Sequence, residues 1–171
     1  PRTSPTGCKV GRSIRPRGIA MFERTLFAGW GDMDFNSHMR NTAYLDKSAD
    51  LRMMYFAAHD FPMAEFMRLK IGPVVMKDEV EYFRELHLLD EVRVTMMLSG
   101  LSEDGSRMKL RNDFYRKDVL AARVTSTAGW LDLAQRKLVC PPEGLLQALK
   151  DADRSEDFQV LPNSGRRENM A

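Results

Sequence analysis

Apolar and polar residues alternate along five runs of the chain, and this period of two is typical of β-strands. The five expected strands are residues 22–28, 74–84, 91–101, 107–116 and 119–133. Between the first and the second of them the period becomes helical, and it holds for residues 41–59. The pattern therefore predicts one long helix and about five strands.

The expected long helix places most of its apolar side chains on one broad face. That face carries Tyr44, Leu45, Ala49, Met53, Tyr55 and Phe56. Arg52 projects into the middle of the same face, so we expect it to have a carboxylate or carbonyl partner, or to extend to the edge of the helix. A structural ion pair explains Arg52 better than a catalytic role does.

Breaker and turn residues divide the rest of the chain into short connected elements. Residues 103–106 and 117–118 have the composition of tight turns, whereas residues 63–69 and 143–151 predict short helices. The clean alternation indicates an antiparallel sheet with one packed face and one partly solvated face. A curved sheet of about five strands wrapped around the long helix satisfies both burial patterns, so the expected fold class is α+β.

The two ends of the chain are expected to lie outside this domain, which spans residues 21–151. Residues 1–20 form a basic arm without the apolar stretch of a secretory signal. Met21 opens the first regular segment and is a candidate natural start. Residues 152–171 are polar and rich in breakers, so we expect a poorly ordered tail.

Composition narrows the class of protein. The 171 residues are 43% hydrophobic and 29% charged, as in an ordinary soluble domain, and the net charge of +2 is too small to indicate a nucleic-acid partner. Cys8 and Cys140 suggest neither a disulfide framework nor a zinc site, which fits a reducing compartment. No apolar run approaches the ~20 residues needed to cross a bilayer. We therefore expect a cytoplasmic protein with no membrane partner.

Chemically capable side chains gather in one loop, between the first strand and the long helix. Asp32, Asp34, Asn36 and His38 follow one another at i, i+2 spacing. Singly, each is equally well explained as a helix cap or a surface residue, but the four together are not. The helix N-terminus that follows can stabilise a developing oxyanion, so the loop predicts a hydrolytic site. Asp32 we interpret as a structural, loop-capping carboxylate.

In their order and spacing, these motifs resemble those of hotdog-fold thioesterases, in particular the 4-hydroxybenzoyl-CoA thioesterase-like group, over residues 22–150. The matching positions are Gly31-Asp32-Met33-Asp34, His38, Asn41, Tyr44, Arg52, Gly72-Pro73-Val74-Val75 and Tyr82-(x)7-Asp90. Residues 34–38 are also similar to the Asp-x-Asn-x-His run of plant acyl-carrier-protein thioesterases. The hotdog fold that this implies is one long central helix wrapped by a curved antiparallel sheet.

The resemblance implies hydrolysis of an acyl-CoA or acyl-carrier-protein thioester, with no metal or redox cofactor. By the first pattern, Asp34 is the catalytic carboxylate and the backbone N–H of Asn41 binds the thioester carbonyl. By the second pattern, Asn36 and His38 are catalytic. The first pattern does not include Asn36 and His38, and the second requires a later catalytic residue that the sequence does not identify, so both mechanisms stay open.

Two other function classes stay open, namely a hotdog hydratase or dehydratase and a non-catalytic acyl-thioester binding module. The helical residues 43–58 contain no His for the first, and the intact Asp34, Asn36 and His38 set argues against the second. Sheet edges invite pairing, and residues 74–84 suit pairing with a second copy. We therefore expect a homodimer, or a tetramer of two dimers. The family resemblance implies that each active site then lies at the subunit boundary.

Overall fold

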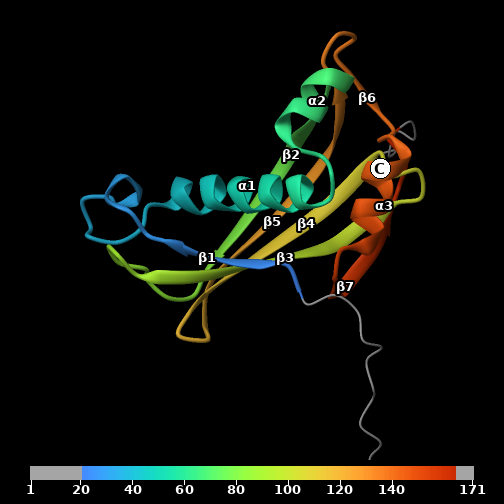
Figure 1. The fold of residues 1–171 in the computed structure, drawn as a ribbon. Helices are drawn as coiled ribbons and strands as arrows, with labels where there is room; N and C mark the ends of the chain where they lie inside the picture. Colours follow the sequence, from blue (N-terminus) through green and yellow to red (C-terminus); the bar gives the residue numbers. More distant parts are fainter. Residues whose placement is uncertain (1–20, 165–171) are drawn as a thin grey trace, which may run out of the picture.

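A long helix crosses the concave side of one strongly curved sheet in this computed structural model, which describes residues 21–164 (Figure 1). The elements in chain order are β1 (Glu23–Phe27), the 3-10 helix η1 (Trp30–Asp32), α1 (Asn41–Ala58), α2 (Met63–Leu69), β2 (Ile71–Tyr82), β3 (Glu91–Ser102), β4 (Arg107–Arg116), β5 (Val119–Asp132), β6 (Lys137–Val139), α3 (Glu143–Asp151) and β7 (Arg154–Leu161). The main path of the sheet is β1-β3-β4-β5-β2. This arrangement confirms the expected α+β class and hotdog fold.

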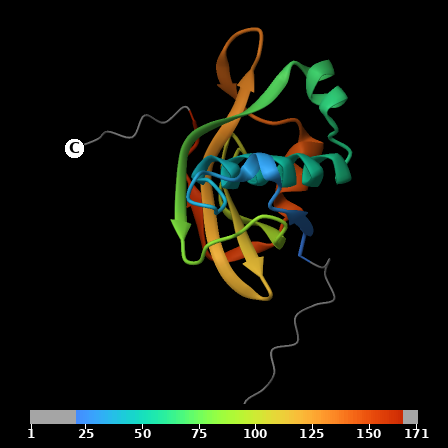
Figure 2. The same ribbon diagram turned by 90° about the vertical axis from the view of Figure 1, so that its left-hand side faces the viewer.

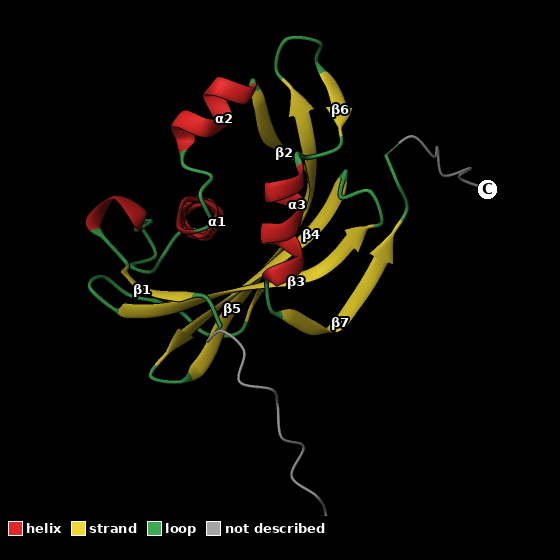
Figure 3. Cartoon of the chain, turned by 45° about the vertical axis from the view of Figure 1, so that its right-hand side comes forward, coloured by secondary structure: helices red, strands yellow, loops and turns green. Residues whose placement is uncertain are grey.

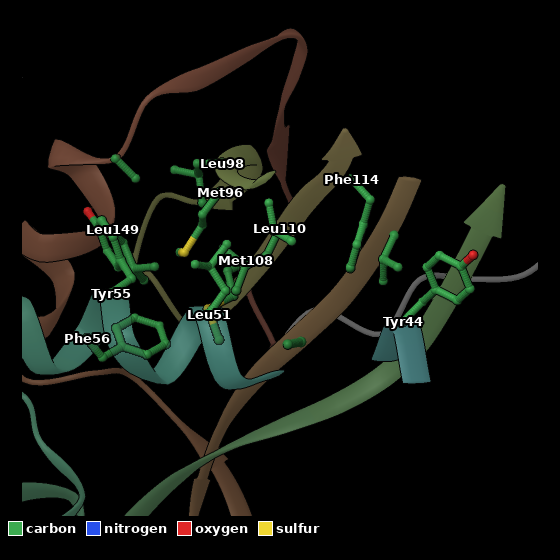
Figure 4. Close-up of a cluster of buried hydrophobic side chains, with 14 of the residues drawn as sticks. Tyr44, Leu51, Tyr55, Phe56, Met96, Leu98, Met108, Leu110, Phe114 and Leu149 are labelled. Carbon is green, nitrogen blue, oxygen red and sulfur yellow. The ribbon is translucent and has the colours of Figure 1, made fainter. Parts of the chain in front are cut away.

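Helix α1 lies within the curve of the sheet (Figure 2), and one stripe of its surface is buried. The buried residues of α1 are Ala43, Tyr44, Ser48, Leu51, Arg52, Tyr55 and Phe56. Ala49, which the pattern places on the apolar face, is exposed, whereas Leu51 belongs to the buried stripe. Apolar side chains of β3, β4 and α3 complete this core (Figure 4), among them Met96, Leu98, Met108, Leu110 and Leu149.

Arg52 is buried in the stripe and has a side-chain carbonyl among its partners, as the sequence predicts, but within the described residues no carboxylate forms the expected ion pair with it. Its Nε donates to Asn112 Oδ1 at 2.8 Å, and its Nη2 donates to Ser126 Oγ at 2.7 Å. The Ser126 hydroxyl in turn hydrogen-bonds to Asp78 on β2. Burial lowers the pKa of Arg52 to about 10, and the charge of Asp78 opposes that shift. The guanidinium therefore joins α1 to β4, β5 and, through one hydroxyl, β2.

The sheet has seven strands rather than about five, because the alternation of apolar and polar residues did not predict β6 and β7. β6 pairs with the end of β5. β7 pairs in parallel with β3 and lies within residues 152–171, so the expectation of a poorly ordered tail is wrong for residues 154–161. The alternation is weak there because Ser155 is the one buried residue of β7. Backbone pairing and a hydrogen bond of 2.9 Å between Ser155 Oγ and Ser99 Oγ stabilise the strand.

Helix α3 covers the part of the concave face that α1 leaves open (Figure 3). Leu145 and Leu149 are fully buried, and the Tyr55 hydroxyl donates a hydrogen bond to the Ala148 carbonyl. The short helices predicted at residues 63–69 and 143–151 are both confirmed.

β2 forms one end of the sheet and has β5 as its only partner within the described residues. Most of its residues are exposed, including Val75, Met76 and Tyr82. The basic arm, residues 1–20, and Cys8 within it lie outside the described residues. No helix in residues 21–164 is long and apolar enough to cross a membrane.

Candidate active site

The loop between β1 and α1 folds into a small hairpin that brings Asp34 and His38 opposite each other. Met33 and Met39 form an isolated antiparallel bridge, and the Asp34 N–H donates to the His38 carbonyl at 3.0 Å. Ser37 adopts a φ of 66°, a left-handed conformation that is uncommon outside glycine, and its N–H donates to the Asp34 carbonyl at 3.2 Å. The chain reversal thus places the side chains of Asp34 and His38 at the base of one turn.

Asp32 has the loop-capping role that the sequence predicts. Its carboxylate accepts hydrogen bonds from the Gly29 N–H at 2.7 Å and forms an ion pair with Lys47 Nζ at 2.8 Å. Burial alone would raise the pKa of Asp32, but the hydrogen bonds from Lys47 and Gly29 outweigh burial and hold the pKa below its usual value. Asp32 therefore joins the loop to α1 and is already fully engaged.

The Asp34 carboxylate is held by its own turn and stays accessible. Its Oδ1 accepts a hydrogen bond from the Asn36 N–H at 2.9 Å. Its Oδ2 lies 3.7 Å from His38 Nδ1, and the two side chains are 28% and 31% exposed. At that separation a protonated imidazole interacts with the carboxylate by charge. An oriented, accessible carboxylate can act as a nucleophile or as a general base.

The N-terminus of α1 presents an unused backbone donor beside this carboxylate. Arg40 precedes the helix without capping it, and the first turn of α1 carries no acidic residue. The Thr42 N–H is occupied by Asn41 Oδ1 at 2.9 Å, and the Ala43 N–H by the Arg40 carbonyl at 3.1 Å. Within residues 21–164 the Asn41 N–H has no acceptor. It is therefore free to donate to an oxyanion, with the helix dipole in support.

One groove of about 590 Å³ joins the loop, the helix end and the segment that follows β2. Its lining residues are Asp34, His38, Met39, Asn41, Tyr44, Tyr82, Phe83, Arg84 and Glu85. The structure thus brings together Asp34, His38 and Asn41, three of the four predicted site residues. Asn36 does not line the groove and lies exposed at the tip of the hairpin.

Sequence reasoning missed the second wall of the groove, which residues 82–85 form. The Met39 N–H donates to the Leu86 carbonyl at 2.7 Å and holds this segment against the loop. The rings of Tyr44 and Tyr82 meet edge to face, with centroids 5.2 Å apart. The sequence did contain a signal for this wall. Two adjacent aromatic residues, Tyr82 and Phe83, interrupt the alternation of the strand, and Arg84 and Glu85 follow them. Within residues 21–164, no group of three or more His, Cys, Asp or Glu side chains is placed to hold a metal ion.

Comparison with known proteins relates the chain to a family. The family model described as the Thioesterase-like superfamily matches residues 28–149. Protein SAV2348 from Staphylococcus aureus, solved in complex with CoA, is similar with a TM-score of 0.71 and 18% identity, over 92% of this chain and 99% of that one. No curated protein matches the chain in sequence.

Two further solved structures have similar folds and carry thioesterase names. Slr0204, a 1,4-dihydroxy-2-naphthoyl-CoA thioesterase from Synechocystis, has a TM-score of 0.69 at 13% identity, over 77% of this chain and 97% of that one. YbaW, named a probable thioesterase, from Escherichia coli, has a TM-score of 0.65 at 20% identity, over 79% of this chain and 100% of that one. At these identities the likeness shows a shared fold.

Proposed function

Because the chain belongs to the Thioesterase-like superfamily, we propose that it hydrolyses acyl-CoA thioesters to a free acid and a thiol. The observation that carries this proposal is the meeting of the Asp34 carboxylate and the unused Asn41 N–H in one groove. A thioester carbonyl between them would be open to attack on carbon while its oxygen accepts a hydrogen bond. This is the pairing of nucleophile or base with an oxyanion donor that acyl transfer requires.

Two routes are consistent with this geometry. In the first, an Asp34 oxygen attacks the carbonyl carbon, the C–S bond breaks with its electron pair going to sulfur, and water hydrolyses the resulting anhydride. In the second, Asp34 takes a proton from water, the hydroxide formed attacks the carbonyl carbon, and the C–S bond then breaks with its electron pair going to sulfur. In both routes the Asn41 N–H stabilises the oxyanion, a contribution typically worth about 3 kcal/mol of barrier.

The other predicted site residues have supporting roles in this proposal. His38 positions the water or protonates the departing thiolate, because it shares the groove with Asp34. Asn36 orients the carboxylate through its backbone N–H. A thiolate is a good leaving group and the helix end supplies the oxyanion contact, so the proposed reaction uses no metal or redox cofactor.

The test is release of free thiol from a panel of fatty and aromatic acyl-CoAs, detected with a thiol reagent. We expect Asp34→Asn to fold normally, as judged by circular dichroism, and to lower turnover at least ~100-fold, the usual scale for loss of an acid–base or nucleophilic group. Asp50→Asn is the matched control, because Asp50 is an exposed carboxylate of α1 outside the groove. Turnover of Asp34→Asn within a fewfold of the wild type would contradict the assignment.

A further inference from the structure

Tyr44 and Tyr55 are both buried tyrosines of α1, and the structure uses their hydroxyls differently. Each residue is only 3% exposed. The Tyr55 hydroxyl donates a hydrogen bond to the Ala148 carbonyl and so joins α1 to α3. Within residues 21–164 the hydroxyls of Tyr55 and Tyr115 have protein partners, whereas that of Tyr44 has none. The fold therefore leaves the Tyr44 hydroxyl unused.

The Tyr44 side chain is held in place by its neighbours, but its hydroxyl opens onto the active groove. Its ring meets those of Tyr82 and Phe114 edge to face, with centroids 5.2 and 5.4 Å away. Tyr44 lines the same groove as Asp34 and Asn41, and its oxygen is not enclosed by the core. Figure 4 shows this oxygen directed away from the other labelled side chains. A ligand in the groove can therefore reach it.

Packing alone does not account for this hydroxyl. A phenylalanine at position 44 would make the same edge-to-face contacts, without the cost of taking an unpaired hydroxyl out of most of its water. That cost is offset when a bound molecule supplies the missing hydrogen bond. The lack of a partner for this hydroxyl within the described residues thus points to a ligand atom as its partner.

The Tyr44 hydroxyl keeps its proton at neutral pH and is therefore a hydrogen-bond donor. Burial raises the pKa of Tyr44 to about 12, and the neighbouring Tyr82 and Glu85 add to this shift. A phenol with such a pKa is uncharged near pH 7 and can donate its O–H. In the groove this donor suits the oxygen of an uncharged carbonyl that becomes negative during a reaction.

Helix geometry directs the Tyr44 side chain towards the free donor of Asn41. Asn41 is the first residue of α1, and Tyr44 follows at i+3, on the same face of the helix. Long side chains of a helix lean towards its N-terminus, so the phenol leans over the turn that carries the Asn41 N–H. The two donors thus belong to the same end of α1, and both residues line the groove with Asp34.

We propose that Tyr44 is a further catalytic residue, whose hydroxyl donates a second hydrogen bond to the thioester oxygen beside the Asn41 N–H. The inference rests on the proposed function, because the reacting carbonyl must lie next to Asp34. When the carbonyl carbon is attacked, the electron pair of the C=O π bond moves onto oxygen, and both hydrogen bonds strengthen. The proton stays on Tyr44 throughout. The carbonyl forms again as the C–S bond breaks with its electron pair going to sulfur.

Two matched variants test this role by steady-state kinetics and thermal unfolding. Tyr44→Phe removes only the unpartnered hydroxyl. We expect it to lower kcat about 10²-fold, the scale for one lost oxyanion donor, with an unchanged KM and an unfolding temperature no lower than that of the wild type. Tyr55→Phe removes a hydroxyl that holds α3, so it should lower the unfolding temperature and leave kcat unchanged. A kcat of Tyr44→Phe within twofold of the wild type, or a change in KM alone, would overturn the proposal.

Infrared spectroscopy of a bound ketone gives a test that does not depend on turnover. The probes are an aromatic ketone, S-phenacyl-CoA, and a fatty one, S-(2-oxodecyl)-CoA, each isotopically labelled at the carbonyl. A methylene separates the sulfur from the carbonyl, so neither probe has a thioester bond to hydrolyse. Because each hydrogen bond to the carbonyl oxygen lowers its stretching frequency, we expect a lower frequency on the wild type and on Tyr55→Phe than on Tyr44→Phe.

The infrared result also separates this proposal from the hydrolysis itself. Equal frequencies on all three proteins, or binding of neither probe to the wild type, would overturn the role of Tyr44. If no thioester is hydrolysed while the frequency still depends on Tyr44, the proposed function fails and the hydrogen bond stands.

Discussion

His38 lies 3.7 Å from Asp34 across the base of the hairpin, and both side chains face the same groove. This position allows the imidazole to hold a water molecule for attack, to give a proton to the leaving thiolate, or to stabilise the carboxylate by charge. The first two roles involve the reacting atoms, whereas the third acts only through Asp34. Kinetics of His38 variants can tell them apart.

If His38 transfers a proton in the reaction, His38→Ala should lower turnover ~10²-fold or more. It should also remove one limb of the pH–rate profile. His38→Gln, which keeps a hydrogen-bonding group but cannot carry the proton, should lose the same limb. A small loss of rate with an unchanged pH profile would leave Asp34 as the sole acid–base group.

The residue types of the site were predictable, but their arrangement was not. The i, i+2 spacing of residues 32–38 suggested that the side chains of Asp34, Asn36 and His38 act together. The chain reverses instead at Ser37, whose left-handed backbone is not typical of serine. The reversal pairs Asp34 with His38 and leaves Asn36 at the tip of the turn. The Asn41 N–H stays unused because of the hydrogen bonds that the neighbouring N–H groups make, and the sequence pattern does not reveal those bonds.

At the scale of elements, a cluster of charged side chains connects β4, β5 and β7. Asp113 on β4 accepts paired hydrogen bonds from Arg111 and from Arg123 of β5. Arg111 also lies 3.6 Å from Glu156 and 3.5 Å from Asp157 of β7. Burial alone would raise the pKa of Asp113, but hydrogen bonds from Arg123 and Arg111 outweigh burial and lower the pKa.

Removal of this carboxylate should destabilise the fold, because Arg111 is only 6% exposed and would lose its main partner. We expect Asp113→Ala to lower the free energy of unfolding by about 3–5 kcal/mol at pH 7, measured by urea denaturation. Because the folded pKa lies below the unfolded value of about 3.9, the stabilisation is complete above that pH and is lost as the pH falls through the folded pKa. The gap between the wild type and Asp113→Ala should therefore narrow on acidification.

Asp118→Asn is the control for this experiment, because Asp118 is 90% exposed in its pair with Arg93 and asparagine, unlike alanine, tolerates the left-handed φ of 61° at this position. Exposed pairs contribute about 0–1 kcal/mol, so this variant should stay close to the wild type at every pH. A constant gap between the wild type and Asp113→Ala from pH 7 down to acid would refute the assigned role of the carboxylate.

The elements themselves differed in how far the sequence predicted them. Residues 74–84, 91–101, 107–116 and 119–133 alternate clearly in sequence, and these strands appear within a few residues of the predicted bounds. The expected single packed face does not hold for every strand, because β3 is buried on both faces from Val94 to Ser102 and β2 is mostly exposed. β7 carries no such signal, because a parallel edge strand stabilised by backbone pairing and ion pairs buries little apolar surface. Burial also decides the face of α1, where Ser48 and Arg52 are enclosed despite their polarity.

At the scale of the whole molecule, β2 is a 12-residue edge strand with exposed apolar side chains. We propose that two copies pair along this strand, forming a homodimer that can associate further into a tetramer. Unpaired edges of this length are usually covered, charged or paired. The active groove begins where β2 ends, at Tyr82, so the second copy would lie next to it.

Light scattering coupled to size exclusion should therefore give at least twice the chain mass of 19.6 kDa. Met76→Lys places a charge on β2 and should shift the protein towards the monomer, with loss of activity in parallel. Val160→Lys places the same charge on the other edge, at an exposed apolar position of β7, and should leave the mass unchanged. A monomer with full activity at the assay concentration would disprove the assembly.

The two edges of the sheet differ in length, and this difference limits how many copies can assemble by strand pairing. β2 has 12 residues available to pair with a second copy. The opposite edge is divided between the five residues of β1 and the irregular β7, which pairs with β3 at only four positions. Chains with two long sheet edges could pair edge to edge without limit and form open-ended fibrils. With a single long edge, two copies related by a two-fold axis leave no long edge free, so no third copy can extend the sheet. β7 would then prevent further strand pairing at the opposite edge and so protect the protein against fibre formation.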